Sequence, residues 1–105
     1  GGSFSWFIDA LDWVMTSGSR PAVFSASLGG RGTISTVKTA IDKAVAAGVV
    51  VVVAAGNSGR TSVPEACSYS PAYVPSAITV GATQLGDGRA SYSCYGKCID
   101  IFAPG

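Results

Sequence analysis

The sequence predicts an α/β fold in which a parallel β-sheet carries flanking helices. The chain has 105 residues, 48% of them hydrophobic, which is the size of one small domain. Five consecutive valines at residues 49–53 form an apolar run without alternation, as is typical of a strand buried on both faces of a parallel sheet. A strand pattern and an amphipathic helical pattern precede this run, and that order indicates a βαβ unit.

Composition excludes several classes of function. The net charge is +1, so no electrostatic argument favours binding to nucleic acid or to an anionic membrane. No apolar run reaches the 18 or so residues that a membrane-spanning helix needs. The sequence contains no His, which removes the usual general base and the commonest metal ligand from this chain. We therefore expect neither nucleic acid nor a membrane among its partners.

The first helix is predicted from residue 4 to about residue 15. Apolar residues recur there at helical spacing, at Phe4, Phe7, Ile8, Leu11, Val14 and Met15. Ser3 or Ser5 is placed to cap its start, and Gly18 to end it in a left-handed conformation. Asp9 and Asp12 lie off the apolar stripe, so we expect them on a solvated face.

A strand is expected at residues 22–27, followed by a flexible Gly-rich loop at 28–32. Thr33 or Ser35 is placed to cap a second helix, which Gly48 ends just before the valine strand. After a long loop, short strands are predicted at residues 77–81, 90–93 and 99–102, with a turn at 84–88.

Two Gly-rich segments are expected to flank one crevice. Residues 27–30 and 54–57 each follow a strand of the predicted parallel pair. The carboxyl ends of parallel strands meet at one sheet edge, where α/β proteins bind ligands. The first segment is either an ordinary loop or a stretch that pairs with an extended peptide. Asn57 is either a turn residue or a donor that stabilises a developing oxyanion, which is worth about 3 kcal/mol.

Residues 30–35 approach the dinucleotide-binding fingerprint but do not complete it. The segment follows a strand and opens a helix, yet Ser35 stands where the last Gly is required. The acidic ribose ligand expected after the next strand is also missing, and Asn57 occupies that place. We therefore expect no nucleotide site.

Six short motifs, taken together and in order, resemble the subtilisin-like serine proteases, and most closely the proteinase K branch. They lie at residues 27–30, 53–57, 69–72, 78–82, 92–96 and 100–105. The resemblance covers essentially the whole chain. It implies the subtilisin-like parallel-sheet fold, with residues 1–105 as a central segment of one catalytic domain that is truncated at both ends.

The resemblance implies a secreted endopeptidase that uses a Ser-His-Asp triad. By the same resemblance, the triad Asp and His precede residue 1 and the Ser follows residue 105, so we expect this segment to be inactive alone. The implied partners are a polypeptide substrate, the rest of the catalytic domain and an inhibitory pro-region. The resemblance also implies that catalysis requires no cofactor. The alternative is a non-catalytic peptide-binding or degenerate relative that keeps the cleft without the triad.

The resemblance also implies roles for individual residues. Asn57 matches the oxyanion-hole Asn. The positions that match the substrate-binding strand and the walls of the main specificity pocket are Ser27, Leu28, Gly29, Ala54, Ala55 and Gly56. Gly2 matches the facing substrate strand, with Gly1 beside it at the chain end. The small uncharged wall residues indicate a roomy pocket for an apolar or aromatic side chain.

The resemblance further implies a disulfide and a metal site. Cys67 and Cys98 match a disulfide of thermophilic proteinase K-like enzymes, which fits secretion. With three Cys, at most one disulfide forms within the chain, and reduced thiols or a pairing of Cys67 with Cys94 are the alternatives. A structural calcium ion is implied at Pro75, Ala77 and Asp100. For Asp100 the alternative is a hydrogen bond at a strand end.

Overall fold

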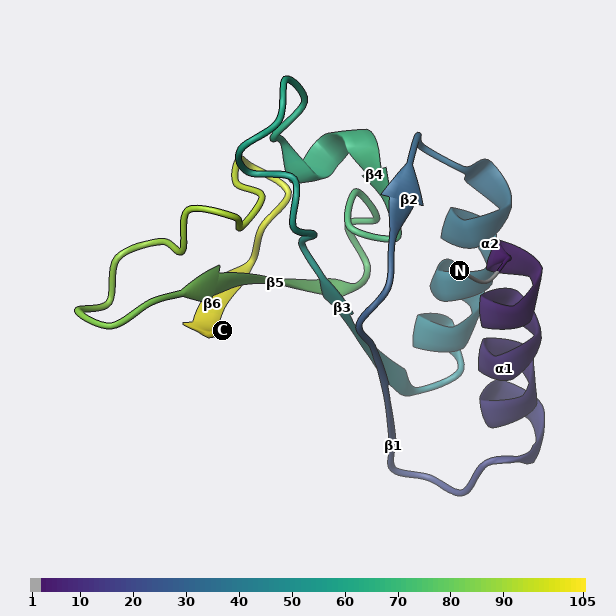
Figure 1. Ribbon diagram of the computed structural model, residues 1–105. Helices are drawn as coiled ribbons and strands as arrows, with labels where there is room; N and C mark the ends of the chain where they lie inside the picture. Colours follow the sequence, from purple (N-terminus) through teal and green to yellow (C-terminus); the bar gives the residue numbers. More distant parts are fainter. Residues whose placement is uncertain (1–2) are drawn as a thin grey trace.

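The computed structural model describes residues 3–105 and confirms the α/β class. Its main sheet has four parallel strands in the order β1-β3-β5-β6 (Figure 1). These strands are β1 (Ala22–Ala26), β3 (Val49–Ala54), β5 (Ile78–Thr83) and β6 (Ile101–Pro104). Helices α1 (Phe4–Ser17) and α2 (Ser35–Ala46) lie side by side.

A second, two-stranded sheet forms where the sequence predicts only loop. Strands β2 (Gly30–Arg31) and β4 (Tyr69–Ser70) pair antiparallel, and the 3₁₀ helix η1 (Ala66–Ser68) immediately precedes β4. The buried hydroxyl of Ser70 donates a hydrogen bond to the Gly32 carbonyl at 2.7 Å. This pairing fixes the segment that leaves β1.

Helix α1 begins as predicted and ends differently. The Ser3 hydroxyl accepts a hydrogen bond from the Ser5 N–H at 3.1 Å and so caps the helix. The predicted left-handed ending at Gly18 is wrong, since Gly18 is extended with φ −75° and ψ 150°. Glycine is required there for another reason: a Cβ atom on Gly18 would lie 2.6 Å from the Val14 carbonyl oxygen.

The N-terminus of helix α2 is not capped by a side chain of an adjacent residue. Its N-cap residue is Ile34, which has no side-chain capping bond, so the predicted cap by Thr33 or Ser35 is wrong. The Ile34 N–H instead donates to the Ser70 hydroxyl at 2.9 Å. The predicted stop at Gly48 is confirmed, because Gly48 adopts a left-handed φ of +90° after the last helical turn.

Asp42 ties α2 to the turn before β5. Its two carboxylate oxygens accept hydrogen bonds from the Lys38 ammonium and the Ser76 hydroxyl, each at 2.6 Å. The bonds from Lys38 and then Ser76 lower the pKa of Asp42, and the bond to Asp42 raises the pKa of Lys38. Both groups are solvent-exposed, so this ion pair contributes little to stability.

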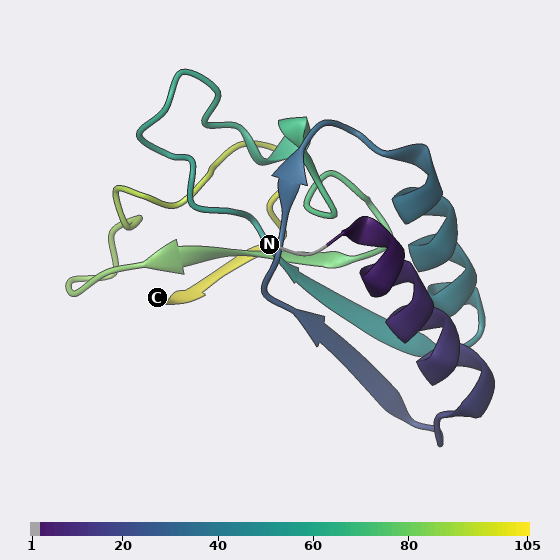
Figure 2. The ribbon, with the colours of Figure 1, turned by 45° about the vertical axis from the view of Figure 1, so that its right-hand side comes forward.

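The core lies between the helices and one face of the sheet. Val49, Val51 and Val53 are buried there, and Phe7 of α1 packs edge-to-face on Phe24 of β1 with ring centroids 5.6 Å apart. Figure 2 shows both helices on the same side of β1 and β3.

The prediction that both faces of the valine strand are buried is therefore wrong. Val50 of β3 is 46% exposed and Val23 of β1 is 67% exposed. Their side chains point away from the helices because successive side chains of a strand alternate between the two faces. Among residues 3–105, both helices cover the same face of these strands.

The C-terminal part follows the prediction with two exceptions. The turn at residues 84–88 is confirmed by a hydrogen bond of 2.9 Å from the Gln84 N–H to the Gly88 carbonyl. Residues 90–93 form a turn rather than a strand, with the Ser93 N–H donating to the Ala90 carbonyl. The last strand begins at Ile101, two residues later than expected.

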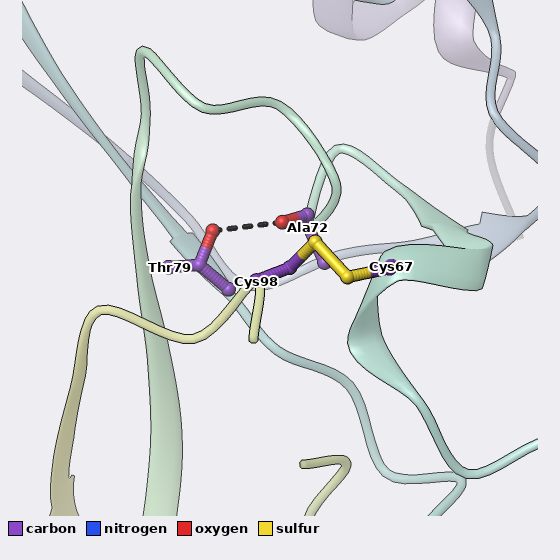
Figure 3. The surroundings of a disulfide bond; sticks show 4 residues. All are labelled: Cys67, Ala72, Thr79 and Cys98. Carbon is purple, nitrogen blue, oxygen red and sulfur yellow. Dashed lines mark hydrogen bonds between the residues drawn. A yellow bond between two sulfur atoms is a disulfide. The ribbon is translucent and has the colours of Figure 1, made fainter. Parts of the chain in front are cut away.

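Cys67 and Cys98 are joined by a disulfide with a Cα–Cα distance of 5.3 Å. Figure 3 shows this bond beside Thr79, whose buried hydroxyl donates to the Ala72 carbonyl at 2.9 Å. Cys94 is a buried free thiol, so the alternative pairing of Cys67 with Cys94 does not form.

No helix in the described part of the chain is long and apolar enough to cross a membrane.

Replacing Cys67 and Cys98 together by Ala should lower the free energy of unfolding of the intact protein. The two residues are 31 positions apart, and opening a loop of that length costs about 3–4 kcal/mol through the entropy of the unfolded chain. The measurement is thermal unfolding with and without a reductant. Reductant should lower the Tm of the wild-type protein toward that of the double variant and leave the variant unchanged. Equal Tm values in oxidising buffer would contradict the prediction.

Candidate active site

One groove runs along the sheet edge where the main strands end. Its cavity volume is about 670 Å³. In the register of β1 and β3, Ala26 lies opposite Val53, so the chain leaves both strands at the same level. The groove-lining residues that follow β1 or close β3 include Ser27, Leu28, Gly29, Ala54, Ala55, Gly56 and Asn57. The structure thus brings these seven sequence-predicted residues together.

The wall of the groove that follows β1 is a three-residue segment that lies close to β4. Ser27, Leu28 and Gly29 lie between β1 and β2 and are all exposed. A Cβ atom on Gly29 would lie 3.3 Å from the Ser70 carbonyl oxygen, so this backbone passes close to β4. The pairing of β2 with β4 then fixes where the segment leads.

The other wall ends in a tight turn at Asn57. Gly56 has a φ of +105°, a conformation that side chains rarely adopt. The Ala55 N–H donates to the Val80 carbonyl at 2.8 Å, which holds the start of the turn against β5. Asn57 itself lines the groove and is exposed to solvent. Asn57 therefore lies at the solvent-exposed surface of the groove.

Sequence reasoning missed the third wall. This wall comes from Val80, Gly81 and Ala82 of β5, from Tyr92, and from Ala103, Pro104 and Gly105. The strand predicted at 77–81 is parallel to the first two, so its carboxyl end belongs at the same edge and could have been included. No sequence pattern could have placed Tyr92 in the groove, because the position of Tyr92 depends on the turn at residues 90–93.

The groove is electrically neutral over the described residues. None of the residues that line it there has a charged side chain. The polar residues that line it include Ser27, Asn57, Ser58 and Tyr92, beside apolar residues such as Leu28 and Ala54. This combination can bind and orient a neutral ligand through hydrogen bonds.

Asp100, which is implied as a metal ligand, makes two hydrogen bonds with the backbone of Thr79. One Asp100 carboxylate oxygen accepts from the Thr79 N–H at 2.7 Å, and the Asp100 N–H donates to the Thr79 carbonyl at 2.9 Å. The alternative hydrogen bond at a strand end is therefore present. Asp100 is exposed, and Ala77 and Pro75 lie just ahead of β5. Within residues 3–105, no three His, Cys, Asp or Glu side chains gather as a metal site.

Gly2, which was matched to a facing substrate strand, lies outside the described residues, as does Gly1. Nothing in the geometry therefore bears on that assignment. Over the described residues, Tyr69, Ser70 and Ala72 line the groove in addition to the three walls.

The sequence is similar to those of known proteins that are named as serine proteases. An extracellular serine proteinase of Thermus sp. (strain Rt41A) is 55% identical over 104 residues, which is 99% of this chain and 24% of that protein. Alkaline serine exoprotease A of Vibrio alginolyticus is 44% identical over 99% of this chain and 18% of that protein. The chain thus spans about a quarter or less of the length of these curated relatives.

A solved structure shares the fold. The crystal structure of a cold adapted subtilisin-like serine proteinase superposes with a TM-score of 0.91 at 44% identity, covering 100% of this chain and 37% of that one. The model of the subtilase peptidase family matches residues 1–105. Since that match spans the full sequence and the fold agrees with it, the chain belongs to the subtilase family.

Proposed function

We propose that the protein is a serine endopeptidase and that residues 1–105 supply the oxyanion donor and the substrate-binding walls of its catalytic domain. The observation that carries the proposal is the position of Asn57. In a chain of the subtilase family, it lies at the end of β3 in the same groove as the exposed segment Ser27, Leu28 and Gly29. The names of two relatives, both serine proteases, support the reaction class.

In this proposal the wall after β1 binds the peptide backbone, and the wall after β3 binds one peptide side chain. An extended substrate pairs with the backbone of Ser27, Leu28 and Gly29, as a strand added to a sheet edge does. The side chain before the scissile bond enters the space beside Ala54, Ala55 and Gly56. This places the scissile carbonyl near Asn57, whose amide N–H stabilises the oxyanion of the tetrahedral intermediate.

The nucleophile and its base belong to other parts of the catalytic domain. The sequence has no His, so the triad base is supplied from elsewhere, and residues 1–105 alone are inactive in this proposal. The rest of the domain is therefore a required partner, and an inhibitory pro-region is a second. A relative named as extracellular and the disulfide support an extracellular location.

Replacing Asn57 by Ala in the intact enzyme should lower kcat by roughly a hundredfold or more and leave KM nearly unchanged, because the amide acts on charge that develops in the transition state. Steady-state kinetics on a chromogenic peptide measure both constants. The matched control is Asp12→Asn on the exposed face of α1, outside the groove, which should keep wild-type kinetics.

Wild-type turnover in Asn57→Ala would remove the residue from the mechanism. An intact protein that binds peptides in the groove but cleaves none would instead establish the non-catalytic alternative.

Because the groove has no charged side chain, we expect a preference for substrates with an uncharged side chain before the scissile bond. Burying a Lys or Glu side chain without an opposite charge is unfavourable, so peptides with Phe or Leu before the scissile bond should have kcat/KM at least about tenfold higher. The comparison uses a peptide series that differs at that position alone. Equal or faster cleavage after Lys would contradict a pocket formed by Ala54, Ala55 and Gly56.

A structural calcium ion at Pro75, Ala77 and Asp100 forms part of the proposal. One oxygen of Asp100 is already bonded to Thr79, and its exposed carboxylate has a second oxygen to offer a hard cation beside backbone carbonyls. Bound calcium would add stability to the start of β5 and supplies no step of catalysis.

Removing calcium with a chelator should lower the Tm of the intact protein, and Asp100→Asn should abolish the calcium-dependent part of that Tm. Differential scanning calorimetry over a calcium titration gives the readout. Asp87→Asn, in the exposed turn after β5, is the matched control and should keep the full response. An unchanged calcium response in Asp100→Asn would exclude Asp100 as a ligand.

A further inference from the structure

Asn57 lies between two backbone groups that are held by the same residue. The Gly56 carbonyl accepts a hydrogen bond from the Cys94 N–H at 2.9 Å. On the other side, the Ser58 N–H donates to the Cys94 sulfur at 3.4 Å. Both neighbours of Asn57 in the sequence are thus bonded to Cys94, which lies 36 residues away from Ser58.

The thiol also fills the space beneath the turn. Cys94 is 0% exposed and packs in a cluster with Ala55, Ala66 and Ala72. A Cβ atom on Gly56 would lie 3.2 Å from the Cys94 sulfur, so the sulfur occupies the room that the missing side chain leaves. A change at Cys94 therefore acts directly on the turn that carries Asn57.

The segment that holds the turn is itself anchored to the sheet. The Ser93 hydroxyl accepts from the Ala82 N–H at 2.9 Å and donates to the Cys94 carbonyl at 2.9 Å. The Gly59 N–H donates to the Tyr92 carbonyl, also at 2.9 Å. Cys94 is therefore a fixed point relative to β5, against which the Asn57 turn is positioned.

We propose that the buried thiol of Cys94 is a positioning residue that holds Asn57 in its catalytic orientation. This inference rests on the proposed function, since it assigns to Cys94 an effect that is exerted through Asn57. In Cys94→Ala, the Ser58 N–H loses its acceptor and a void opens beside Gly56. The turn gains freedom, and misplacement of a catalytic group by a fraction of an ångström slows the chemical step.

The test is a double-mutant cycle in the intact enzyme with Cys94→Ala, Asn57→Ala and the double variant. Cys94→Ala should lower kcat by roughly tenfold with KM within about twofold of wild type. In the Asn57→Ala background, the same substitution should change kcat by less than about twofold, because no amide remains to be positioned.

Two further variants separate positioning from general destabilisation. Cys94→Ser keeps an acceptor for the Ser58 N–H and should recover part of the lost kcat. It also serves as the test variant if Cys94→Ala does not fold. Val37→Ala removes buried apolar volume from α2, outside the groove and outside the cluster that contains Cys94. It should lower Tm and keep wild-type kcat when assayed well below the Tm.

The outcomes distinguish this inference from the proposed function. If Asn57→Ala is slow and Cys94→Ala lowers kcat equally in both backgrounds, or leaves it unchanged, the positioning role is overturned and the oxyanion role stands. If Asn57→Ala retains wild-type kcat, the oxyanion role fails, and the role of Cys94 fails with it.

Discussion

The parallel pairing of β3 with β1 and β5 is the constraint on which the remaining structure depends. Because the strands run in one direction and in matched register, the chain emerges from each of them at the same edge. The valines that face the helices make β3 the centre of the core. The same strand therefore anchors the fold through its middle and carries the candidate oxyanion donor at its end.

Glycines in this part of the chain let other groups approach the backbone closely. A Cβ atom on Gly59 would lie 2.3 Å from the Ser93 carbonyl oxygen, and one on Gly81 would lie 2.5 Å from the Phe102 ring. The first approach brings the segment after β3 against the segment at 92–94, and the second brings β5 against β6. Most residues that line the groove are glycine, alanine or serine, so their backbone groups are accessible to a ligand.

Part of the 48% hydrophobic content of the sequence lies on the face of the sheet that the helices do not cover. Val23, Val50 and Ile101 are large apolar residues that remain exposed over the described residues. An apolar surface of this kind is stabilised when other protein covers it. It therefore supports the proposal that further parts of a catalytic domain pack against this chain.

The sequence alone determined the features that local pattern encodes. The spacing of Phe7 and Leu11 predicted α1, the valine run predicted β3, and the order of strand, helix and strand predicted a parallel sheet with Asn57 at its edge. The ordered motifs were enough to identify the family, although the roles of the individual groove residues stay predictions.

Only the tertiary structure decided which face of β3 is covered, because a run of identical side chains does not distinguish the two faces of a strand. It also decided that Ser70 holds the start of α2 and that Cys94 holds the Asn57 turn, each across 36 residues of sequence. Periodicity and propensity describe neighbours along the chain. Contacts between distant residues depend on the path of the backbone, which the packing of helices and strands sets.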